Sequence, residues 1–258
     1  MLLTVDKLHV SYPLLGGFFS QRCTKVVKNI SFEIQRGEVL GLVGNSGCGK
    51  STIARCITGL IPKDSGQVFF EGQALKACHP QIQMIFQDPA NSLNPRMNIF
   101  NNIRESLRYG QQSFSKNQSR DHIAQLLEQV GIGADQLQRY PHEFSGGQLQ
   151  RIGIARALAP SPKLIVCDEP VSALDISIQA QVLNLLKSLQ KQHGLSLLFV
   201  THDLAVVRYI SNRCAVMSEG EIVEQGATED LIQKPQHAVT KNLLACVPEL
   251  SAGLGSGE

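Results

Sequence analysis

The chain has 258 residues, of which 43% are hydrophobic and 18% are charged, and its formal net charge is +2. This length and composition are typical of a globular protein able to bury about 70–75% of its unfolded surface, enough for one large α/β domain or a core with a helical insert, and they disfavour a disordered chain. The nearly balanced charge includes no block of lysines and arginines, so we expect no nucleic-acid partner.

Seven cysteines are scattered along the chain without a CxxC pair. Their odd number and spacing fit neither a disulfide framework nor a zinc or iron–sulfur site, so we expect neither cofactor and a reducing compartment. The N-terminal MLLTVDKLHV carries charges within seven residues, unlike a signal peptide, and no stretch approaches the roughly 20 apolar residues of a membrane span. These features together predict a cytoplasmic location.

Residues 1–86 are predicted to be rich in strands. LTVDKLHVSY and ISFEIQRGE alternate apolar and polar residues, VLGLVG is a continuous apolar run, and GQVFFEG indicates half of a hairpin. Between Tyr12 and Lys25, the segment PLLGGFFSQRCT is predicted to form a glycine-broken loop.

A strand, a glycine-rich bend and a helix follow one another from residue 39. The apolar run ends in Gly44-x-x-x-x-Gly49-Lys50-Ser51, the context typical of a phosphate loop. Glycines let backbone N–H groups converge on a phosphate, and the helix directs its positive N-terminus at the same charge. We expect Lys50 to reach the β- and γ-phosphates and Ser51 to ligate Mg²⁺. The expected nucleotide-binding residues here are Gly44, Asn45, Ser46, Gly47, Cys48, Gly49, Lys50, Ser51 and Thr52.

From about residue 88 to 144 an asparagine-rich loop leads into helical patterns. IFNNIRESL and DHIAQLLEQVGI have apolar residues three and four apart, which predicts a helical insert. QQSFSKNQSR at 111–120 contains too few apolar residues to predict a helix and indicates a loop. After residue 145, the strands KLIVCD and SLLFVT alternate with the helices ISIQAQVLNLLKSLQKQ and DLAVVRYIS, which is typical of a parallel sheet.

Two acidic residues end the apolar run KLIVCDE at 163–169. Asp168, at the strand end, is expected to hold the Mg²⁺ shell, and Glu169 to take a proton from the attacking water. The pair alone would also fit a solvated turn, so this interpretation depends on the phosphate loop. The two motifs together predict hydrolysis of Mg-ATP.

The segment EFSGGQLQRIGIARAL at 143–158 places a serine–glycine–glycine turn before an amphipathic helix. Its helix N-terminus is a second anion site. With SGGQ just before the acidic strand, the chain resembles the ATP-binding-cassette ATPases over about residues 1–230. The resemblance implies a P-loop NTPase core with a mixed, mostly parallel sheet, an N-terminal antiparallel β-subdomain and a helical subdomain insert.

That resemblance also implies roles for individual residues. Gln87 resembles the Q-loop residue that contacts Mg²⁺, His202 the switch histidine, and Tyr12 the aromatic residue that stacks on adenine. Glu169, His202 and Gln87 would then be catalytic, and Ser51, Gln87 and Asp168 would hold Mg²⁺. The D-loop would comprise Ser172, Ala173, Leu174 and Asp175, and the signature motif Ser145, Gly146, Gly147 and Gln148. Plainer alternatives stay open for three of these: a helix-start histidine, a loop amide and a half-buried tyrosine.

The family resemblance further implies a single nucleotide-binding domain that is incomplete as a monomer. Residues 1–87 and 160–230 would form the core, 88–159 the helical insert and 231–258 a C-terminal tail. The signature motif would contact ATP held by a second chain. We therefore expect a head-to-tail dimer with a second ABC ATPase, either a copy of this chain or a paralogue.

Three segments are similar to the peptide and nickel importer branch of that family, most closely to the second ATPase of oligopeptide importers. They are PLLGGFF at 13–19, FQDPANSLNPRM at 86–97 and PQHAVTKNLLACVPEL at 235–250. This similarity implies two membrane permeases, indirectly a substrate-binding protein, and a peripheral location on the cytoplasmic face of a bacterial inner membrane. Residues 88–100, with Met97 and Phe100, would form the groove for a permease coupling helix.

Other functions stay open. A nickel or other metal-chelate importer would carry the same motifs. A soluble cassette acting on DNA or ribosomes usually joins two cassettes or carries a long coiled-coil insert, and neither is visible in this sequence. Export or lipoprotein release is disfavoured by SLNPRM and by the 235–250 segment. Some branch members bind an iron–sulfur cluster through cysteines in the tail; here Cys246 alone follows residue 230, so we expect no cluster.

Overall fold

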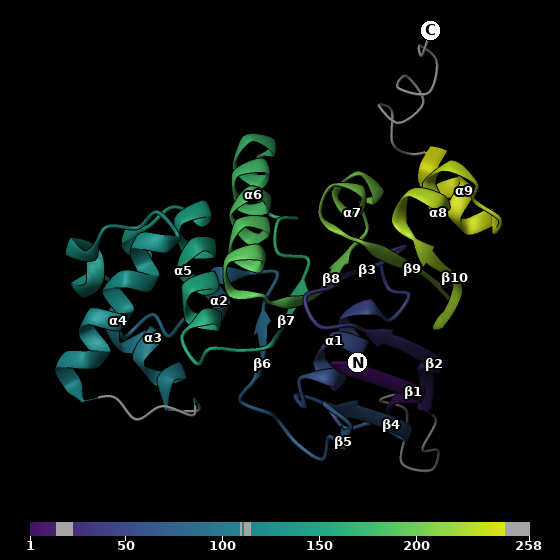
Figure 1. Ribbon diagram of the computed structural model, residues 1–258, viewed down its shortest axis with the longest axis horizontal. Coiled ribbons are helices and arrows are strands. Elements are labelled where there is room, and N and C mark those ends of the chain that lie inside the picture. The colour runs from purple at the N-terminus through teal and green to yellow at the C-terminus, as the bar shows by residue number, and fades with distance from the viewer. Residues whose placement is uncertain (14–22, 109, 111–114, 246–258) are drawn as a thin grey trace, which may run out of the picture. The chain divides into compact units, whose positions relative to one another are not determined.

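A computed structural model describes residues 1–13, 23–108, 110 and 115–245. The chain forms two compact units, residues 1–78 with 198–258, and residues 79–197 (Figure 1). The subdomain boundaries predicted above stay predictions. The elements in chain order are β1 (Leu3–Pro13), β2 (Cys23–Ile34), β3 (Val39–Gly44), α1 (Lys50–Ile57), β4 (Ser65–Phe70), β5 (Gln73–Ala74), β6 (Ile82–Ile85), α2 (Pro89–Ser92), α3 (Ile99–Leu107), α4 (Lys116–Gln129), η1 (Ala134–Gln138), η2 (Pro141–Glu143), α5 (Gly146–Leu158), β7 (Leu164–Asp168), α6 (Ile176–His193), β8 (Ser196–Thr201), α7 (Leu204–Ile210), β9 (Arg213–Ser218), β10 (Glu221–Ala227), α8 (Thr228–Gln233) and α9 (Ala238–Ala245).

An antiparallel sheet in the order β2-β1-β4-β5 begins the first unit. Strands β4 and β5 are joined through Glu71 and Gly72, both with positive φ, which confirms the predicted hairpin. The loop predicted between Tyr12 and Lys25 is shorter than expected, because Pro13 pairs with Cys23 and extends the ladder of β1 and β2. The rest of that loop, residues 14–22, lies outside the described residues.

The rest of the first unit is built on a second sheet, in which most strands are parallel. β3 pairs in parallel with β9, which pairs antiparallel with β10, and β8 is the other neighbour of β3. Helix α1 contacts β2 and β3, while α7, α8 and α9 pack on β3, β9 and β10 (Figure 1). All six residues of β3 are buried, as expected for a strand covered on both faces. The phosphate-loop segment therefore starts from the interior of this unit.

In the second unit, β6 and β7 pair in parallel, and helix α5 lies at the centre of the helical part. Helix α5 contacts α2, α3, α4, α6 and β6. Its predicted apolar face, Leu149, Ile152, Ala155 and Leu158, is buried. IFNNIRESL coincides with α3 and most of DHIAQLLEQVGI lies in α4, so the predicted helical segments are confirmed.

The loop predicted for residues 111–120 is wrong over its second half. Helix α4 begins at Lys116, with Ser115 as its N-cap. The Ser115 hydroxyl accepts from the backbone N–H of Gln118, and the Gln118 side chain accepts from the N–H of Ser115. This capping box specifies a helix start even though the first turn is polar. Residues 111–114 lie outside the described residues.

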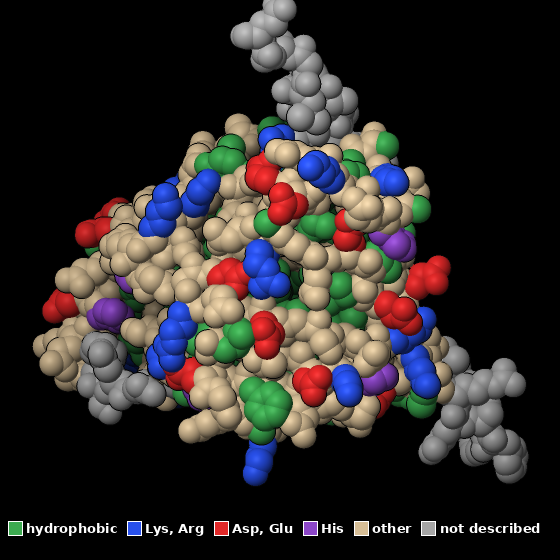
Figure 2. Space-filling model, turned by 45° about the vertical axis from the view of Figure 1, so that its right-hand side comes forward, with side chains coloured by type: hydrophobic (Ala, Val, Ile, Leu, Met, Phe, Trp, Pro, Cys, Tyr) green, Lys and Arg blue, Asp and Glu red, His purple; other side chains and the backbone are tan. Residues whose placement is uncertain are grey.

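The antiparallel N-terminal sheet, the parallel strands covered by helices and the helical segments confirm the predicted α/β fold class. Basic and acidic side chains are mixed on the face shown in Figure 2, in keeping with the balanced net charge. Within the described ranges, no helix combines the length and apolar character needed to cross a bilayer.

Candidate functional site

The bend after β3 depends on two glycines for different reasons. Gly49 has φ +108°, and a Cβ there would stand 2.8 Å from the carbonyl oxygen of Val26. A Cβ at Gly44 would stand 2.1 Å from the carbonyl oxygen of Met217. Neither backbone atom can move aside cheaply, so an alanine at either position would displace the loop.

The same bend presents the N-terminus of α1. Gly49 is the N-cap residue and has no side chain with which to accept from the first N–H groups of the helix. Such groups need a partner, and an anion at the helix N-terminus is a favourable one. Asn45, Ser46 and Gly47 are exposed along the bend, whereas Cys48 and Thr52 are buried. The arrangement suits a phosphate held by backbone donors.

Lys50 is buried, with 4% of its surface exposed, and its ammonium group is held over the bend. Nζ donates to the carbonyl oxygens of Gly44, at 2.7 Å, and Asn45, at 2.9 Å. The Cys48 thiol is 3.8 Å from the same Nζ. The two carbonyls solvate a buried charge and fix its position next to the N-terminus of α1.

In the second unit, β7 ends at the two predicted acids. Asp168 is 3% exposed, and Glu169 is half-buried with φ +46°, a region that non-glycine residues rarely adopt. The backbone N–H and the hydroxyl of Ser172 both donate to the carbonyl oxygen of Glu169, at 3.3 and 3.1 Å. Backbone of this kind costs about 1–3 kcal/mol and is found both in tight turns, such as Glu71 in the β4–β5 hairpin, and at functional sites.

Gln87 lies beside this turn although it is 82 residues away in sequence. Its Nε2 is 3.5 Å from Oε2 of Glu169, at the long limit of a hydrogen bond. The structure thus brings together two of the predicted catalytic side chains.

The segment that follows Gln87 is tied to α3 and α5. Asp88 caps α2 by accepting from Ala90 N, and the Arg156 guanidinium of α5 donates to the carbonyl oxygen of Ser92. Burial lowers the pKa of Arg156. Asn102 of α3 is 3% exposed; its Oδ1 accepts from Asn94 N at 2.8 Å, and its Nδ2 donates to the carbonyl oxygens of residues 94, 97 and 98. Residues 88–98 are therefore held in one conformation by side chains from two helices.

The two side chains predicted to line a groove in this segment differ in exposure. Met97 is half-buried, but Phe100 is 8% exposed and lies under the Arg104 guanidinium, 5.4 Å from its ring centroid. Phe100 is thus buried at the start of α3, and its place in a groove for a coupling helix stays a prediction.

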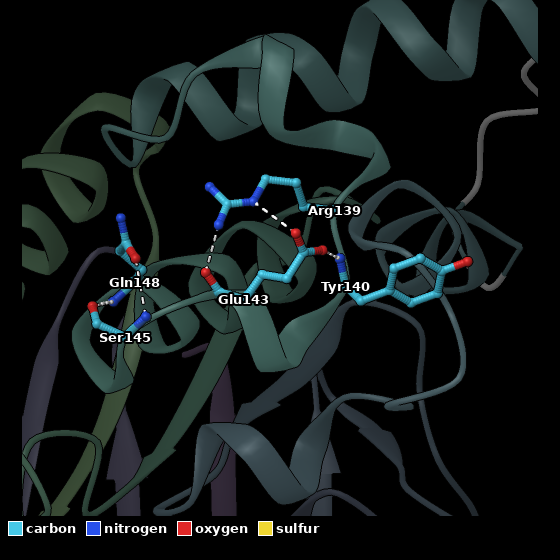
Figure 3. A network of polar contacts seen from close by, with 5 residues as sticks. All are labelled: Arg139, Tyr140, Glu143, Ser145 and Gln148. Carbon is cyan, nitrogen blue, oxygen red and sulfur yellow. Dashed lines mark hydrogen bonds and ion pairs between the residues drawn. The ribbon is translucent and has the colours of Figure 1, made fainter.

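The signature turn begins α5. The Ser145 hydroxyl oxygen accepts from Gln148 N at 3.4 Å, and Gln148 Oε1 accepts from Ser145 N at 3.0 Å (Figure 3). Both Ser145 and Gly146 are exposed. Because Ser145 uses a lone pair to cap the helix, its O–H hydrogen is left to donate to a ligand.

A network that the sequence interpretation missed precedes this turn (Figure 3). Glu143 Oε2 accepts from Tyr140 N at 2.6 Å, and Arg139 Nη2 donates to the Glu143 carbonyl oxygen at 2.7 Å. The Tyr140 N–H, with a smaller contribution from the Arg139 charge, lowers the pKa of the Glu143 carboxyl. Arg139 also lies over the Phe144 ring, 4.8 Å from its centroid. The Arg–Glu pair four residues apart was the available signal in the sequence.

The predicted D-loop connects the Glu169 turn to α6. Ser172, Ala173 and Asp175 are exposed, and Leu174 is half-buried. The Leu174 carbonyl oxygen accepts from Gln179 Nε2 at 2.9 Å, so the loop is fastened to the first turn of α6.

The last two predicted residues lie at strand ends of the first unit. His202 is exposed and follows β8, next to Asp203, which caps α7 by accepting from Ala205 N at 2.7 Å. Tyr12 pairs with Thr24 across β1 and β2, and 39% of its surface is exposed, so part of it is open to a ligand. Tyr12, His202 and the phosphate loop thus belong to the first unit, and the other predicted residues to the second.

Comparison with known proteins gives a family and close relatives. The model of the family described as ABC transporter matches residues 27–172. The oligopeptide transport ATP-binding protein OppF of Haemophilus influenzae is 50% identical over 260 residues, covering 96% of this chain and 78% of that protein. OppF of Bacillus subtilis is 49% identical over 233 residues, covering 87% of this chain and 76% of that protein.

Among solved structures, the fold is similar to that of the ATP-binding cassette MJ0796, in a dimeric post-hydrolysis state bound to ADP and Pi. The TM-score is 0.77 and the identity 26%, over 88% of this chain and 99% of that one.

Proposed function

This chain belongs to the ABC transporter family and is an ATPase, and from that premise we propose that it is the ATP-hydrolysing subunit of an importer that takes up oligopeptides through partner membrane permeases. The observation that carries the proposal is 50% identity, over 96% of this chain, to a protein named for oligopeptide transport. Those names favour oligopeptides over nickel, the other cargo that the sequence left open.

The phosphate loop binds the nucleotide in this proposal. Backbone N–H groups of residues 44–52 contact the phosphates, and the positive N-terminus of α1 adds to the attraction. The Lys50 ammonium, already positioned by two carbonyl oxygens, reaches the β- and γ-phosphates. The exposed part of the Tyr12 ring stacks on adenine.

Three residues offer oxygen ligands for Mg²⁺: the Ser51 hydroxyl, the Gln87 amide and the Asp168 carboxylate. Hydroxyl, amide and carboxylate oxygens are donors that this cation accepts, so the chemistry of each side chain suits the ion. When bound, Mg²⁺ neutralises charge that develops on the phosphate oxygens.

Glu169 is the general base of the proposed reaction. Its carboxylate accepts a proton from the attacking water, and the oxygen of that water forms the new bond to the γ-phosphorus as the bond to ADP breaks. The Ser172 contacts hold the turn that carries Glu169, and Gln87 lies within 3.5 Å of its carboxylate. His202 contacts the γ-phosphate, and its exposure leaves it accessible for that contact.

The signature turn serves an ATP molecule bound by a second ABC ATPase. The Ser145 hydroxyl and the N–H groups of Gly146 and Gly147 donate to the γ-phosphate, so each site needs residues from two chains arranged head to tail. ATP then holds the dimer closed, and hydrolysis removes the bridging charge. The likeness to a dimeric cassette bound to ADP and Pi supports this part.

Two membrane permeases are the proposed partners, with a substrate-binding protein acting through them, at the cytoplasmic face of a bacterial inner membrane. Residues 88–100 form the proposed contact with a permease coupling helix; Asn102 and Arg156 bind the backbone of this segment, which directly follows Gln87. Movement of the permease coupling helix would therefore be transmitted to the Gln87 side chain.

Detergent extraction of the tagged chain from its own cells tests the proposal. Two polytopic permeases should co-purify, and ATP turnover of the complex should rise on addition of binding protein with an oligopeptide. The Lys50→Ala chain should assemble in the same way but show no such rise. Stimulation by nickel alone would reassign the cargo, and co-purification with ribosomal RNA in place of permeases would contradict an importer.

A further inference from the structure

The two signature glycines pack against side chains of the D-loop and α6. A Cβ at Gly147 would stand 2.6 Å from Cγ2 of Ile178, the third residue of α6. A Cβ at Gly146 would stand 3.8 Å from Cδ2 of Leu174, in the D-loop. Ile178 therefore occupies the space that a larger residue at 147 would need.

The segment that carries Leu174 and Ile178 is itself well fixed. Gln179 Nε2 donates to the Leu174 carbonyl oxygen at 2.9 Å, and Gln179 N donates to Asp175 O at 2.8 Å. Deeper along the two helices, Arg151 of α5 donates to Gln181 Oε1 of α6 at 2.7 Å. Helix α6 and the D-loop thus form a firm support for the start of α5.

We propose that Ile178, assisted by Leu174, is a positioning residue that fixes the signature turn against the D-loop and α6 of its own chain. The inference rests on the proposed function, because it gives a positioning role to a contact behind a motif that serves ATP. Gly147 is glycine in this account because Ile178 fills the position of its Cβ. The turn of Glu169, the D-loop and the signature turn of one chain then move together, through Ser172, Leu174 and Ile178.

Two variants test the contact between Gly147 and Ile178: one creates a steric clash, and the other removes it. Gly147→Ala puts a methyl group onto Ile178 Cγ2, and overpacking of that kind should lower ATP turnover by about tenfold to 100-fold. Adding Ile178→Ala removes the clashing atoms, and the methyl group at 147 fills part of the vacated space. We expect the double variant to recover at least about a third of the turnover lost, because the methyl group at 147 no longer meets Ile178 Cγ2.

Matched controls separate packing from other effects. Apart from its chain neighbours and the nearby backbone of its own helix, no described residue has an atom within 4 Å of where a Cβ at Gly153 would stand, so Gly153→Ala should keep wild-type turnover. Ile176 is 86% exposed, so adding Ile176→Ala to Gly147→Ala should restore nothing. Alanine is a better helix former than glycine, so helix propensity cannot explain a loss in Gly147→Ala.

The Ile178 side chain alone gives a second measurement. Ile178→Val keeps a γ-methyl group and should keep turnover, whereas Ile178→Ala should lower the maximal rate about threefold to tenfold. Nucleotide affinity at the phosphate loop of the isolated chain should be equal in wild type, Ile178→Val and Ile178→Ala. If Ile178→Ala simply failed to fold, its nucleotide affinity would fall as well.

Two results would overturn the inference while leaving the proposed function intact: a double variant as inactive as Gly147→Ala beside an active wild type, or a Gly147→Ala variant with full turnover. Absence of turnover in the wild type with every partner would instead overturn the proposed function. Thermal unfolding then still tests the contact, because Ile178→Ala must restore part of the stability lost in Gly147→Ala.

Discussion

The phosphate loop and the signature turn are both glycine-rich and both open a helix, yet they differ in how the helix N-terminus is satisfied. Gly49 leaves the N-terminus of α1 without a side-chain cap, whereas Ser145 and Gln148 form a complete capping box on α5. The glycines at 44 and 49 are required by close backbone atoms and a positive φ. Gly147 is required by a side chain of another helix.

That difference indicates what each turn does. The first leaves backbone N–H groups for the substrate and holds a lysine ready, so it can bind an anion by itself. In the second, the capping box already pairs the N–H groups of Ser145 and Gln148, and the proposed donors to a ligand are the exposed Ser145 hydroxyl and the N–H groups of Gly146 and Gly147. In the proposed function, this turn therefore completes a site whose main binding groups come from another chain.

The largest loss of ATP turnover is expected from Glu169→Gln, which should impair hydrolysis without weakening nucleotide binding. Glu169→Gln should lower ATP turnover by about 10²–10⁴-fold, because an amide cannot accept the proton of the attacking water. Nucleotide binding should persist, since neither turn is altered. Steady-state hydrolysis with Mg²⁺, beside a binding titration, measures both. Unchanged turnover would remove Glu169 from the mechanism.

Ser145→Asp tests whether the signature turn faces a phosphate group in addition to capping α5. Aspartate caps a helix as well as serine, so the free energy of unfolding should change by less than about 0.5 kcal/mol. A carboxylate facing the γ-phosphate of a second chain should nevertheless cut turnover about 100-fold, because like charges repel. Ser145→Ala is the complement: it loses the cap and about 1 kcal/mol of stability. An active Ser145→Asp chain would show that this turn faces no phosphate.

Lys50→Ala tests whether the phosphate loop depends on its lysine for nucleotide affinity. Losing a charge-assisted contact to phosphate costs roughly 1.5–3 kcal/mol, so nucleotide affinity should fall about tenfold or more. Lys191→Ala, an exposed lysine in the last turn of α6, removes the same charge and should leave the affinity unchanged. Equal affinities of the two variants in a nucleotide titration would refute the role of Lys50.

The smallest change is expected in the pH dependence of stability, through Glu143 next to the signature turn. The pKa of Glu143 is lowered in the folded protein, so its ionised form contributes stability at neutral pH. That contribution is present above the unfolded-state pKa and is lost as pH falls through the lower folded-state pKa. Thermal unfolding from about pH 7 to about pH 3 should show wild type above Glu143→Gln at first and converging with it in acid. A constant gap would exclude this carboxylate as the cause.

Local patterns correctly predicted the strand, the bend and the helix that surround the expected phosphate loop, because the three are consecutive in sequence. The start of α4 was missed for a specific reason: its first turn is polar, and Ser115 and Gln118 announce it through capping rather than through apolar spacing. Apolar spacing alone did not show that the Phe100 ring is buried with the Arg104 guanidinium over it.

Contacts between distant segments were beyond local patterns. Gln87 meets Glu169 across 82 residues, and Ile178 fills the space beside Gly147 only because α5 and α6 pack together. A sequence motif identifies such residues as belonging to a site but carries no information on which side chain stands behind them. The support of the signature turn therefore had to come from the structure.

In the proposed function, the signature turn of this chain completes the site on the phosphate loop of a second ABC ATPase, either a copy of this chain or a paralogue. The most direct test of a site shared between copies is ATP turnover in an equal mixture of Glu169→Gln and Ser145→Asp chains, each inactive alone. In a mixed dimer, one site carries both changes and the other carries neither, so turnover should return to about a quarter of the wild-type value. A mixture no more active than either variant would contradict a site shared between copies of this chain.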